Sequence, residues 1–252
     1  MRYLPTRVMA TVIAFGLWLV PRSSGQDAVP AEILQRTFLM KVGNSTGTAF
    51  TVDYKGTIYV ITARHLAVDL PESKPVFQLW LNNRWEDLHP VRKILPTSAD
   101  VDIALFETEQ KTPQPFQVAT AAQGTTLGQQ VWFLGYPFGD TAMTSRMENQ
   151  ILPFIKRGTI SAINGSNPEA VVLYIDGFNN PGFSGGPIVY WSFNEHAYRI
   201  LGVVQGFRND TAKVAVNGQR LDTNVLVNSG ILTAYSIKHA IDAIEAAQKK
   251  LP

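Results

Sequence analysis

After residue 31 the chain is divided into short runs of β-branched and aromatic residues, separated by Gly, Pro, Asn and Asp. Each run has about the length of an ordinary strand, and none sustains helical periodicity. Many short strands at this spacing are typical of sandwiches and barrels rather than of β-α-β units. The predicted strands are Gly47–Val52, Thr57–Thr62, Val76–Leu81, Ile103–Glu107, Val131–Tyr136, Gly158–Ile163, Val171–Ile175, Pro187–Trp191 and Ile200–Gln205.

The C-terminal segment has a different periodicity. From Ile237 to Leu251, apolar residues recur at intervals of three and four, and the preceding Ser236 can cap a helix. Lys249 and Lys250 would suit the negative end of the helix dipole. We therefore predict a helix over residues 236–252 that packs on the strand-rich body, with an interaction helix as the alternative.

Composition excludes several kinds of site. The 252 residues include no cysteine and only four histidines, which excludes disulfide scaffolds, thiolate metal sites and cysteine nucleophiles. We expect no metal and no cofactor. Three of the 22 basic residues lie in the first 25 positions, so the remaining chain has 19 Lys and Arg against 20 Asp and Glu. With no basic run, a nucleic acid partner is not expected.

The first 25 residues have the features of a secretory signal peptide. Arg2 and Arg7 precede the uncharged apolar run Val8–Val20, and small residues stand before Gln26. The alternative, a membrane anchor, needs about 20 apolar residues, more than this run supplies. We expect an exported protein, periplasmic or secreted, with no stable membrane insertion once the signal is removed. The lack of cysteine favours a bacterial origin.

Changes in composition divide the rest of the chain. A polar connector bearing Pro113 and Pro115 separates two groups of strands of similar size. The predicted organisation is an N-terminal arm over 26–35, a first strand-rich unit over 36–110, the connector over 111–118, a second unit over 119–235 and the helix over 236–252.

Gly182–Pro187, with the sequence Gly-Phe-Ser-Gly-Gly-Pro, is the clearest local sign of chemistry. A serine hydroxyl is a weak nucleophile until a base takes its proton. Neighbouring glycines allow a tight turn that aims backbone N–H groups at a developing oxyanion. The same residue types also build ordinary turns, so this segment alone leaves both interpretations open.

A base and an acid would have to accompany such a serine. His65 is the preferred base, because it follows the apolar strand Ile58–Ala63 and would be held on rigid structure. Asp100 and Asp102 both precede a predicted strand and share one face, so spacing does not choose between them as the acid. Among the other histidines, His89 precedes Pro90, His196 lies in a polar loop and His239 lies on the predicted terminal helix.

Taken together, six segments resemble one family of enzymes, and the likeness covers about residues 36–245. Three of them, in the order His, Asp, Ser, resemble chymotrypsin-like serine proteases: Thr62–His65, Asp102–Leu105 and Gly182–Pro187. Three more resemble the HtrA-type branch: Gly43–Phe50, Leu134–Gly139 and Gly158–Ser161.

The resemblance implies an all-β fold of two six-stranded antiparallel β-barrels, a C-terminal α-helix and an active site between the barrels. It implies that Ser184 attacks the scissile carbonyl, His65 transfers the proton, and Asp102 rather than Asp100 orients the imidazole. The backbone N–H groups of Gly182 and Ser184 would form the oxyanion hole.

A polypeptide substrate would, by the same resemblance, add as a strand along the edge formed by Gln205, Gly206 and Phe207. Phe178 and Leu232 would line the pocket for the residue before the cleaved bond, together with Phe207. With no acid at its base, this pocket predicts cleavage after small or medium apolar residues. The oligomeric state is left open.

The sequence departs from the family pattern at Phe183 and at Arg64, and the first departure suggests an alternative function. Phe183 stands where digestive proteases carry aspartate and HtrA-type enzymes carry asparagine, and a large aromatic ring could distort the oxyanion donors. Arg64 adjoins the proposed base. The alternative is a weak or inactive protease fold that binds peptides. No room remains for the PDZ domains of HtrA-type proteins, so PDZ-gated activation is not expected.

Overall fold

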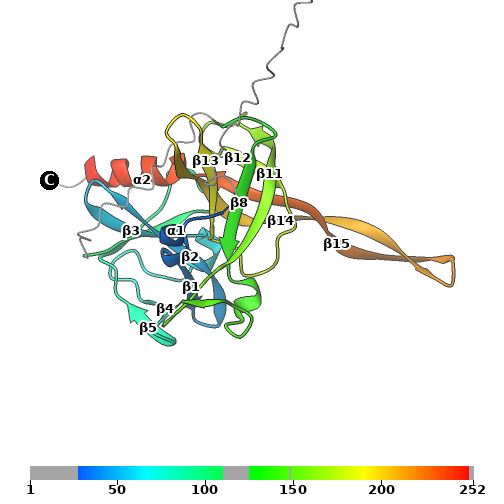
Figure 1. Cartoon of the computed structure of the whole chain (residues 1–252), viewed down its shortest axis with the longest axis horizontal. Helices are drawn as coiled ribbons and strands as arrows, with labels where there is room; N and C mark the ends of the chain where they lie inside the picture. Colours follow the sequence, from blue (N-terminus) through cyan, green and yellow to red (C-terminus); the bar gives the residue numbers. More distant parts are fainter. Residues whose placement is uncertain (1–27, 110–124, 148, 250–252) are drawn as a thin grey trace, which may run out of the picture.

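The computed structural model describes residues 28–109, 125–147 and 149–249. Its strands form an open sheet from the first part of the chain and a closed barrel from the second, and helix α2 (Lys238–Lys249) lies across one end (Figure 1). The predicted signal segment and connector lie outside the described residues. The all-β class with a C-terminal helix is confirmed.

The first sheet has seven antiparallel strands in the order β5-β4-β1-β2-β3-β7-β6. Two of its hairpins turn in two residues with positive φ, at Lys55-Gly56 and Asn82-Asn83, as type I′ turns require. The strands are β1 Thr37–Val42, β2 Ser45–Tyr54, β3 Thr57–Thr62, β4 Phe77–Leu81, β5 Arg84–Leu88, β6 Arg92–Ile94 and β7 Ala104–Glu107.

This sheet is a half-barrel, whereas the sequence predicted a closed barrel of six strands. Its two end strands, β5 and β6, are not paired with each other. β5 carries Arg84, Glu86 and Asp87, and charged side chains protect a sheet edge from further pairing. β6 is only three residues long, which leaves little edge to pair.

The second sheet closes on itself in the order β11-β12-β15-β14-β13-β8. Its interior is filled by Phe133, Phe183, Tyr190 and Leu232, all almost fully buried. The strands are β8 Gln130–Gly135, β11 Phe154–Asn164, β12 Val172–Asp176, β13 Pro187–Ser192, β14 Ala197–Val216 and β15 Gln219–Ser236, and a separate pair is formed by β9 Arg146–Met147 and β10 Gln150–Ile151.

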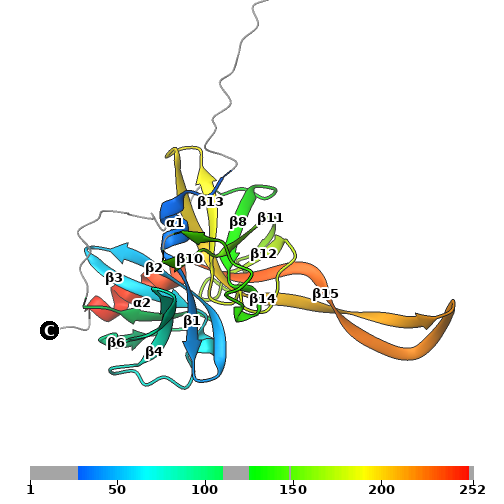
Figure 2. The same cartoon turned by 60° about the horizontal axis from the view of Figure 1, so that its bottom comes forward.

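β14 and β15 continue far beyond the barrel as a two-stranded ribbon, which we call the arm and define as residues 208–228. In both views the arm extends away from the rest of the molecule (Figures 1 and 2). Its tip is the turn at Asn217-Gly218, again with two positive φ angles. The sequence analysis predicted no strand in this stretch.

One apolar core joins the two sheets and α2. It includes Phe50 and Leu105 from the first sheet and Leu134 and Val203 from the barrel. Ile244 of α2 packs into the same cluster, as its predicted periodicity requires. The Ser236 hydroxyl accepts a hydrogen bond from the Lys238 N–H at 3.3 Å, which is the predicted N-terminal cap. This shared core therefore holds the two sheets and α2 together.

The remaining elements are small. Helix α1 (Ala31–Gln35) lies in the predicted N-terminal segment 26–35. Two short 3-10 helices are η1 (Arg64–Leu66) and η2 (Pro137–Gly139). Among the described residues, no helix has the length and apolarity that a membrane span needs.

Candidate active site

The first sheet brings His65 and Asp102 together. His65 lies in η1, directly after β3, and Asp102 lies in the loop before β7. The imidazole Nδ1–H donates to Asp102 Oδ2 at 2.7 Å, and the His65 backbone N–H donates to Oδ1 at 2.8 Å. Both carboxylate oxygens are therefore engaged by one residue, which fixes the ring and the tautomer that carries its proton on Nδ1.

Two neighbouring charged residues take no part in this pair. Asp100 is exposed, and its backbone N–H is bonded to Ser98 Oγ at 3.4 Å. Arg64 donates from Nη1 to the Ala99 carbonyl at 3.3 Å, so its guanidinium is held at the loop before β7. The structure thus joins Asp102, and not Asp100, to the imidazole.

Ser184 lies in the loop between β12 and β13, on the barrel, and its loop packs against the first sheet. A Cβ at Gly185 would lie 2.2 Å from the Thr48 carbonyl and 2.8 Å from the backbone N of Ala63, two residues before His65. Only glycine allows this approach. The serine loop and the histidine segment are therefore in direct contact.

The Ser184 hydroxyl donates to the Gln205 carbonyl at 2.9 Å. Within the described residues it has no hydrogen bond to the imidazole of His65. The backbone carbonyl of Ser184 accepts from the Thr48 N–H at 2.9 Å, which ties the loop to β2.

The residues before Ser184 form a tight turn, Asn180–Phe183, which we call the oxyanion turn. Pro181 at its second position and Gly182, with φ of 99°, at its third are what a type II turn requires. The Phe183 N–H closes the turn on the Asn180 carbonyl at 3.3 Å.

The direction of the Gly182 amide follows from its neighbour. The Pro181 carbonyl accepts from the Phe138 N–H at 2.8 Å, and across a trans peptide the Gly182 N–H points the opposite way. Neither this N–H nor that of Ser184 has an acceptor in the described part of the chain. Two donors without an acceptor in one loop are what an oxyanion hole requires.

Thr48, a fully buried residue of β2, holds the oxyanion turn from the opposite sheet. Its hydroxyl donates to the Gly182 carbonyl at 2.7 Å and accepts from the Tyr136 N–H at 3.1 Å. A Cβ at Gly182 would lie 2.1 Å from the Tyr136 carbonyl, so glycine is required here for space as well as for φ. Sequence reasoning missed Thr48, because its partner is 134 positions away.

Phe183 does not intrude on the cleft. Its ring is fully buried in the barrel and meets Phe133 edge-on, with ring centroids 5.5 Å apart. The aromatic side chain thus anchors the turn in the core and leaves the donors unobstructed.

A lysine that the sequence analysis did not single out lies behind this turn. Lys156 of β11 donates from Nζ to the Phe178 carbonyl at 2.8 Å and to Asn180 Oδ1. The same ammonium stands 5.3 Å from the Phe183 ring centroid and 5.6 Å from that of Phe178. Burial lowers the pKa of Lys156 from its ordinary value.

The predicted substrate-binding residues separate into two groups. Gln205, Gly206 and Phe207 are half-buried on β14, and Phe178 is 58% exposed. Leu232, in contrast, is fully buried in the barrel core, where it pairs with Phe207 across the sheet. Its place in the pocket wall stays a prediction.

Asn179 joins the oxyanion turn to the base of the arm. It is almost completely buried, and its Nδ2 donates to the Gly206 carbonyl at 3.0 Å. Its own carbonyl accepts from Asn228 Nδ2 at 2.7 Å. The start of the turn and the two strands at the base of the arm are therefore bonded to one residue, through its side chain and its backbone carbonyl.

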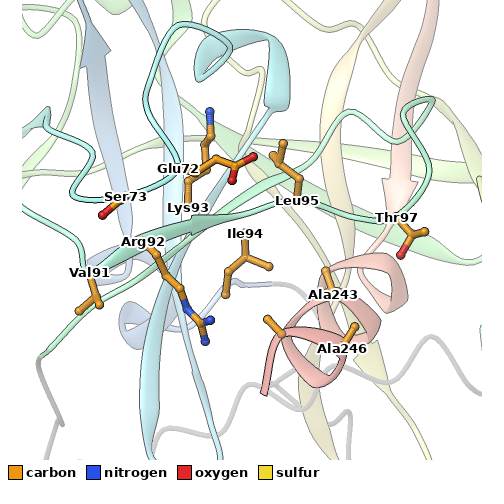
Figure 3. Close-up of a pocket in the computed structure, with 11 residues that line it drawn as sticks. Glu72, Ser73, Val91, Arg92, Lys93, Ile94, Leu95, Thr97, Ala243 and Ala246 are labelled. Carbon is orange, nitrogen blue, oxygen red and sulfur yellow. The ribbon is translucent and has the colours of Figure 1, made fainter. Parts of the chain in front are cut away.

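A cavity of about 700 Å³ lies elsewhere, between β6 and α2 (Figure 3). Its cations are already engaged: Arg92 Nε bonds Glu107 Oε2 at 2.6 Å, and Lys93 Nζ donates to the Leu70 carbonyl. None of the predicted site residues lines it. Within the described ranges, no group of three acidic or histidine side chains is placed to hold a metal ion.

The sequence and structure were compared with known proteins. Residues 47–192 match the model of the trypsin-like peptidase domain, a span that includes His65, Asp102 and Ser184. No curated protein matches the sequence.

Among solved structures, an inactive form of Rv3671c from M. tuberculosis H37Rv is similar with a TM-score of 0.53 and 15% identity, over 88% of this chain and 91% of that one. The HtrA-type protease AlgW with a tripeptide is similar with a TM-score of 0.54 and 19% identity, over 86% of this chain and 61% of that one. At these identities the likeness concerns the fold.

Proposed function

The chain belongs to the trypsin-like peptidase family, and from this premise we propose that it is an exported serine endopeptidase that hydrolyses flexible or unfolded polypeptides. The observation that carries the proposal is the two-point attachment of Asp102 to His65, beside a serine loop that packs on the same segment. Export rests on the signal-like features of residues 1–25.

The proposed reaction begins with the Ser184 hydroxyl. Rotation about its Cα–Cβ bond moves the hydroxyl from the Gln205 carbonyl toward His65 Nε2, which is unprotonated while Nδ1–H is bonded to Asp102. Oγ attacks the scissile carbonyl as Nε2 takes its proton, and the same proton then passes to the departing amine. Water, activated by His65 in turn, hydrolyses the acyl-enzyme and restores the serine.

The oxyanion turn supplies the electrostatic part of this proposal. The unpaired N–H groups of Gly182 and Ser184 would donate to the tetrahedral oxygen without reorganising. Three neighbours support their orientation: Phe138 on the Pro181 carbonyl, Thr48 on the Gly182 carbonyl and Lys156 on Asn180. The buried Phe183 ring thereby replaces the charged partner used by cleavage-activated proteases.

Substrate main chain would bind along Gln205–Phe207. The Gln205 carbonyl that now accepts from Ser184 would accept a substrate N–H, which frees the hydroxyl. The Lys156 ammonium lies beside the backbone of Phe178, a predicted residue of the pocket for the side chain before the cleaved bond. Its positive charge would repel a lysine or arginine side chain of the substrate in that pocket. This agrees with the predicted preference for small or medium apolar residues before the cleaved bond.

The test is covalent labelling together with proteolysis. The protein is incubated with a fluorophosphonate and, separately, with casein, alongside Ser184→Ala and the matched control Ser161→Ala, which removes an exposed hydroxyl on β11. We expect labelling and casein cleavage in the protein and the control, and neither in Ser184→Ala. Labelling that persists in Ser184→Ala would contradict the assigned nucleophile.

A peptide-binding module without turnover is the second candidate. The hydrogen bond of the Ser184 hydroxyl to Gln205, in place of one to His65, favours it. This candidate would be supported if the folded protein binds casein, does not cleave it and is not labelled by the fluorophosphonate.

A further inference from the structure

The edge of β14 next to Ser184 is open over an unusual length. On this side β14 pairs with β13 only as far as Val203, opposite Pro187. From Gln205 to Val216 the same edge has no neighbouring strand among the described residues, while the other edge stays paired with β15 to the tip. The open edge of β14 therefore runs from the partner of the Ser184 hydroxyl to the end of the arm, with register shifts between Phe207 and Asn209 and between Lys213 and Ala215.

The arm lacks the contacts that normally stabilise a ribbon. A two-stranded hairpin is marginally stable in water, and three strands are the usual minimum for independent stability. Ala212, Val225 and Val227 lie on one face of the ribbon beside the charged Asp210, and Leu226 lies on the other face. Val225 and Leu226 are 44% and 74% exposed.

Two of the usual protections of a sheet edge, a short strand and a proline, are absent from the arm, whereas charged side chains are present. Natural sheets shorten their edge strands or place proline in them, and no proline occurs between Ala197 and Ser236. Arg208, Asp210 and Lys213 provide charges of both signs on β14, which select no single charge in a partner. The pairing capacity is thus general and resides in the main chain.

The base of the arm sets its direction relative to the site. Asn179 holds the Gly206 carbonyl and the Asn228 side chain, and Ser229 Oγ donates to the Arg208 carbonyl at 2.8 Å. These bonds connect the open edge rigidly to the oxyanion turn. A chain that pairs with Gln205–Phe207 is therefore led onto residues 208–216.

We propose that the open edge of β14 over residues 208–216 is an extended binding site for a polypeptide substrate, which adds to the arm as a third strand. All strand pairs of the barrel are antiparallel, so an added strand would run from the tip toward Ser184. The arm would then hold about nine residues that precede the cleaved bond. Such a substrate has to be extended over this whole length, as unfolded polypeptides are; the inference rests on the proposed function.

The first test uses peptides with one constant cleavage site and either three or twelve residues before the cleaved bond. We expect kcat/KM to rise roughly tenfold with the extension, the gain from one or two net main-chain hydrogen bonds. A scrambled extension should retain the gain, and an extension N-methylated at alternate residues should lose it. Equal gain from the N-methylated extension would overturn main-chain pairing.

The second test shortens the arm. Residues 210–227 are replaced by Asn-Gly, which keeps the paired base residues Asn209 and Asn228 and a turn of the same type as the tip. We expect the short peptide to be cleaved as before and the gain from the extension to disappear. A gain that survives in this variant would overturn the proposal.

Binding separates this inference from the proposed function. Fluorescence anisotropy of the labelled peptides is measured on Ser184→Ala, with the full and the shortened arm. Tighter binding of the long peptide that depends on the arm supports the inference even where the unmodified protein cleaves nothing, which would overturn the proposed function alone. Cleavage without length dependence overturns the inference alone. Light scattering measures the oligomeric state of both forms. If shortening the arm changes the oligomeric state but not peptide binding, the arm is a contact between copies of the chain and the inference is wrong.

Discussion

The half-barrel and the closed barrel contribute different chemistry to the candidate site. The half-barrel provides titratable side chains, with His65 and Asp102 joined to each other. The barrel provides the alcohol and backbone dipoles, aimed by a turn whose geometry comes from Pro181 and Gly182. The His65–Asp102 pair is formed within the half-barrel alone. The turn before Ser184 belongs to the closed barrel but is held by Thr48 of the half-barrel. The orientation of the Gly182 and Ser184 N–H groups therefore depends on the contact between the two sheets.

The largest expected effect tests the half-barrel. Asp102→Asn should lower kcat about 10⁴-fold, because the amide favours the wrong imidazole tautomer. Asp100→Asn removes an exposed carboxylate two residues away and should change kcat less than about twofold. Peptide hydrolysis at neutral pH measures both. A larger loss in the Asp100 variant would reverse the assignment.

The interface is tested by Thr48→Val, which keeps the shape and removes the hydroxyl. The Gly182 carbonyl and Tyr136 N–H lose their partner, so we expect kcat to fall about 10²-fold, toward the cost of losing one oxyanion donor. Thr37→Val is the control, because its equally buried hydroxyl donates to the Ile33 carbonyl in its own segment of the chain. Similar kinetics in the two variants would mean that the turn holds its orientation without the other sheet.

Support from within the barrel should be weaker. Lys156→Met retains the aliphatic stem and removes the hydrogen bonds to the Phe178 carbonyl and to Asn180, the first residue of the oxyanion turn. We expect kcat/KM to fall about tenfold, mainly through kcat, since one to two net hydrogen bonds are lost. Arg157→Met, on the opposite face of β11, should leave kinetics unchanged. A change in KM alone would place Lys156 in substrate binding rather than in positioning.

The smallest effect concerns stability where α2 meets the barrel. His239 is buried, its Nε2 accepts from the Val171 N–H at 2.9 Å, and desolvation lowers its pKa from the ordinary value. The unfolded chain thus binds a proton at higher pH than the folded one, so stability falls as pH drops below about 6.5.

His239→Gln can still accept the hydrogen bond but does not titrate. Its thermal midpoint should therefore decrease less between pH 7.5 and pH 5.5 than that of the unmodified protein. The exposed His89→Gln serves as the control. If the thermal midpoints of the His239 variant and the unmodified protein change equally with pH, His239 is not the cause of the loss of stability at low pH.

Each strand that the sequence predicted has a buried side, but β1 was not predicted although its Leu39 and Met40 are buried. Thr57–Thr62 is β3 as predicted, and the remaining predicted strands lie on or within a residue or two of strands that contribute to the core. The arm was missed because both of its faces are in solvent, so its sequence carries no burial pattern. The dipeptide Asn217-Gly218 was the available signal, as it favours a two-residue hairpin turn.

Prediction of the site was limited in the same way. The resemblance named Asp102, which the structure bonds to His65, but Thr48 and Lys156 act through partners that are distant in sequence. Phe183 illustrates the limit most directly: the sequence raised the concern of a distorted turn, and only the position of Phe133 places its ring in the core.

The bond from Thr48 to the carbonyl of Gly182 has a consequence for the newly made protein. A chain whose halves have each folded but have not yet docked would possess its acid, base and alcohol, with nothing to fix the receptor for negative charge. The proposed proteolytic activity would therefore arise only after the two sheets have docked.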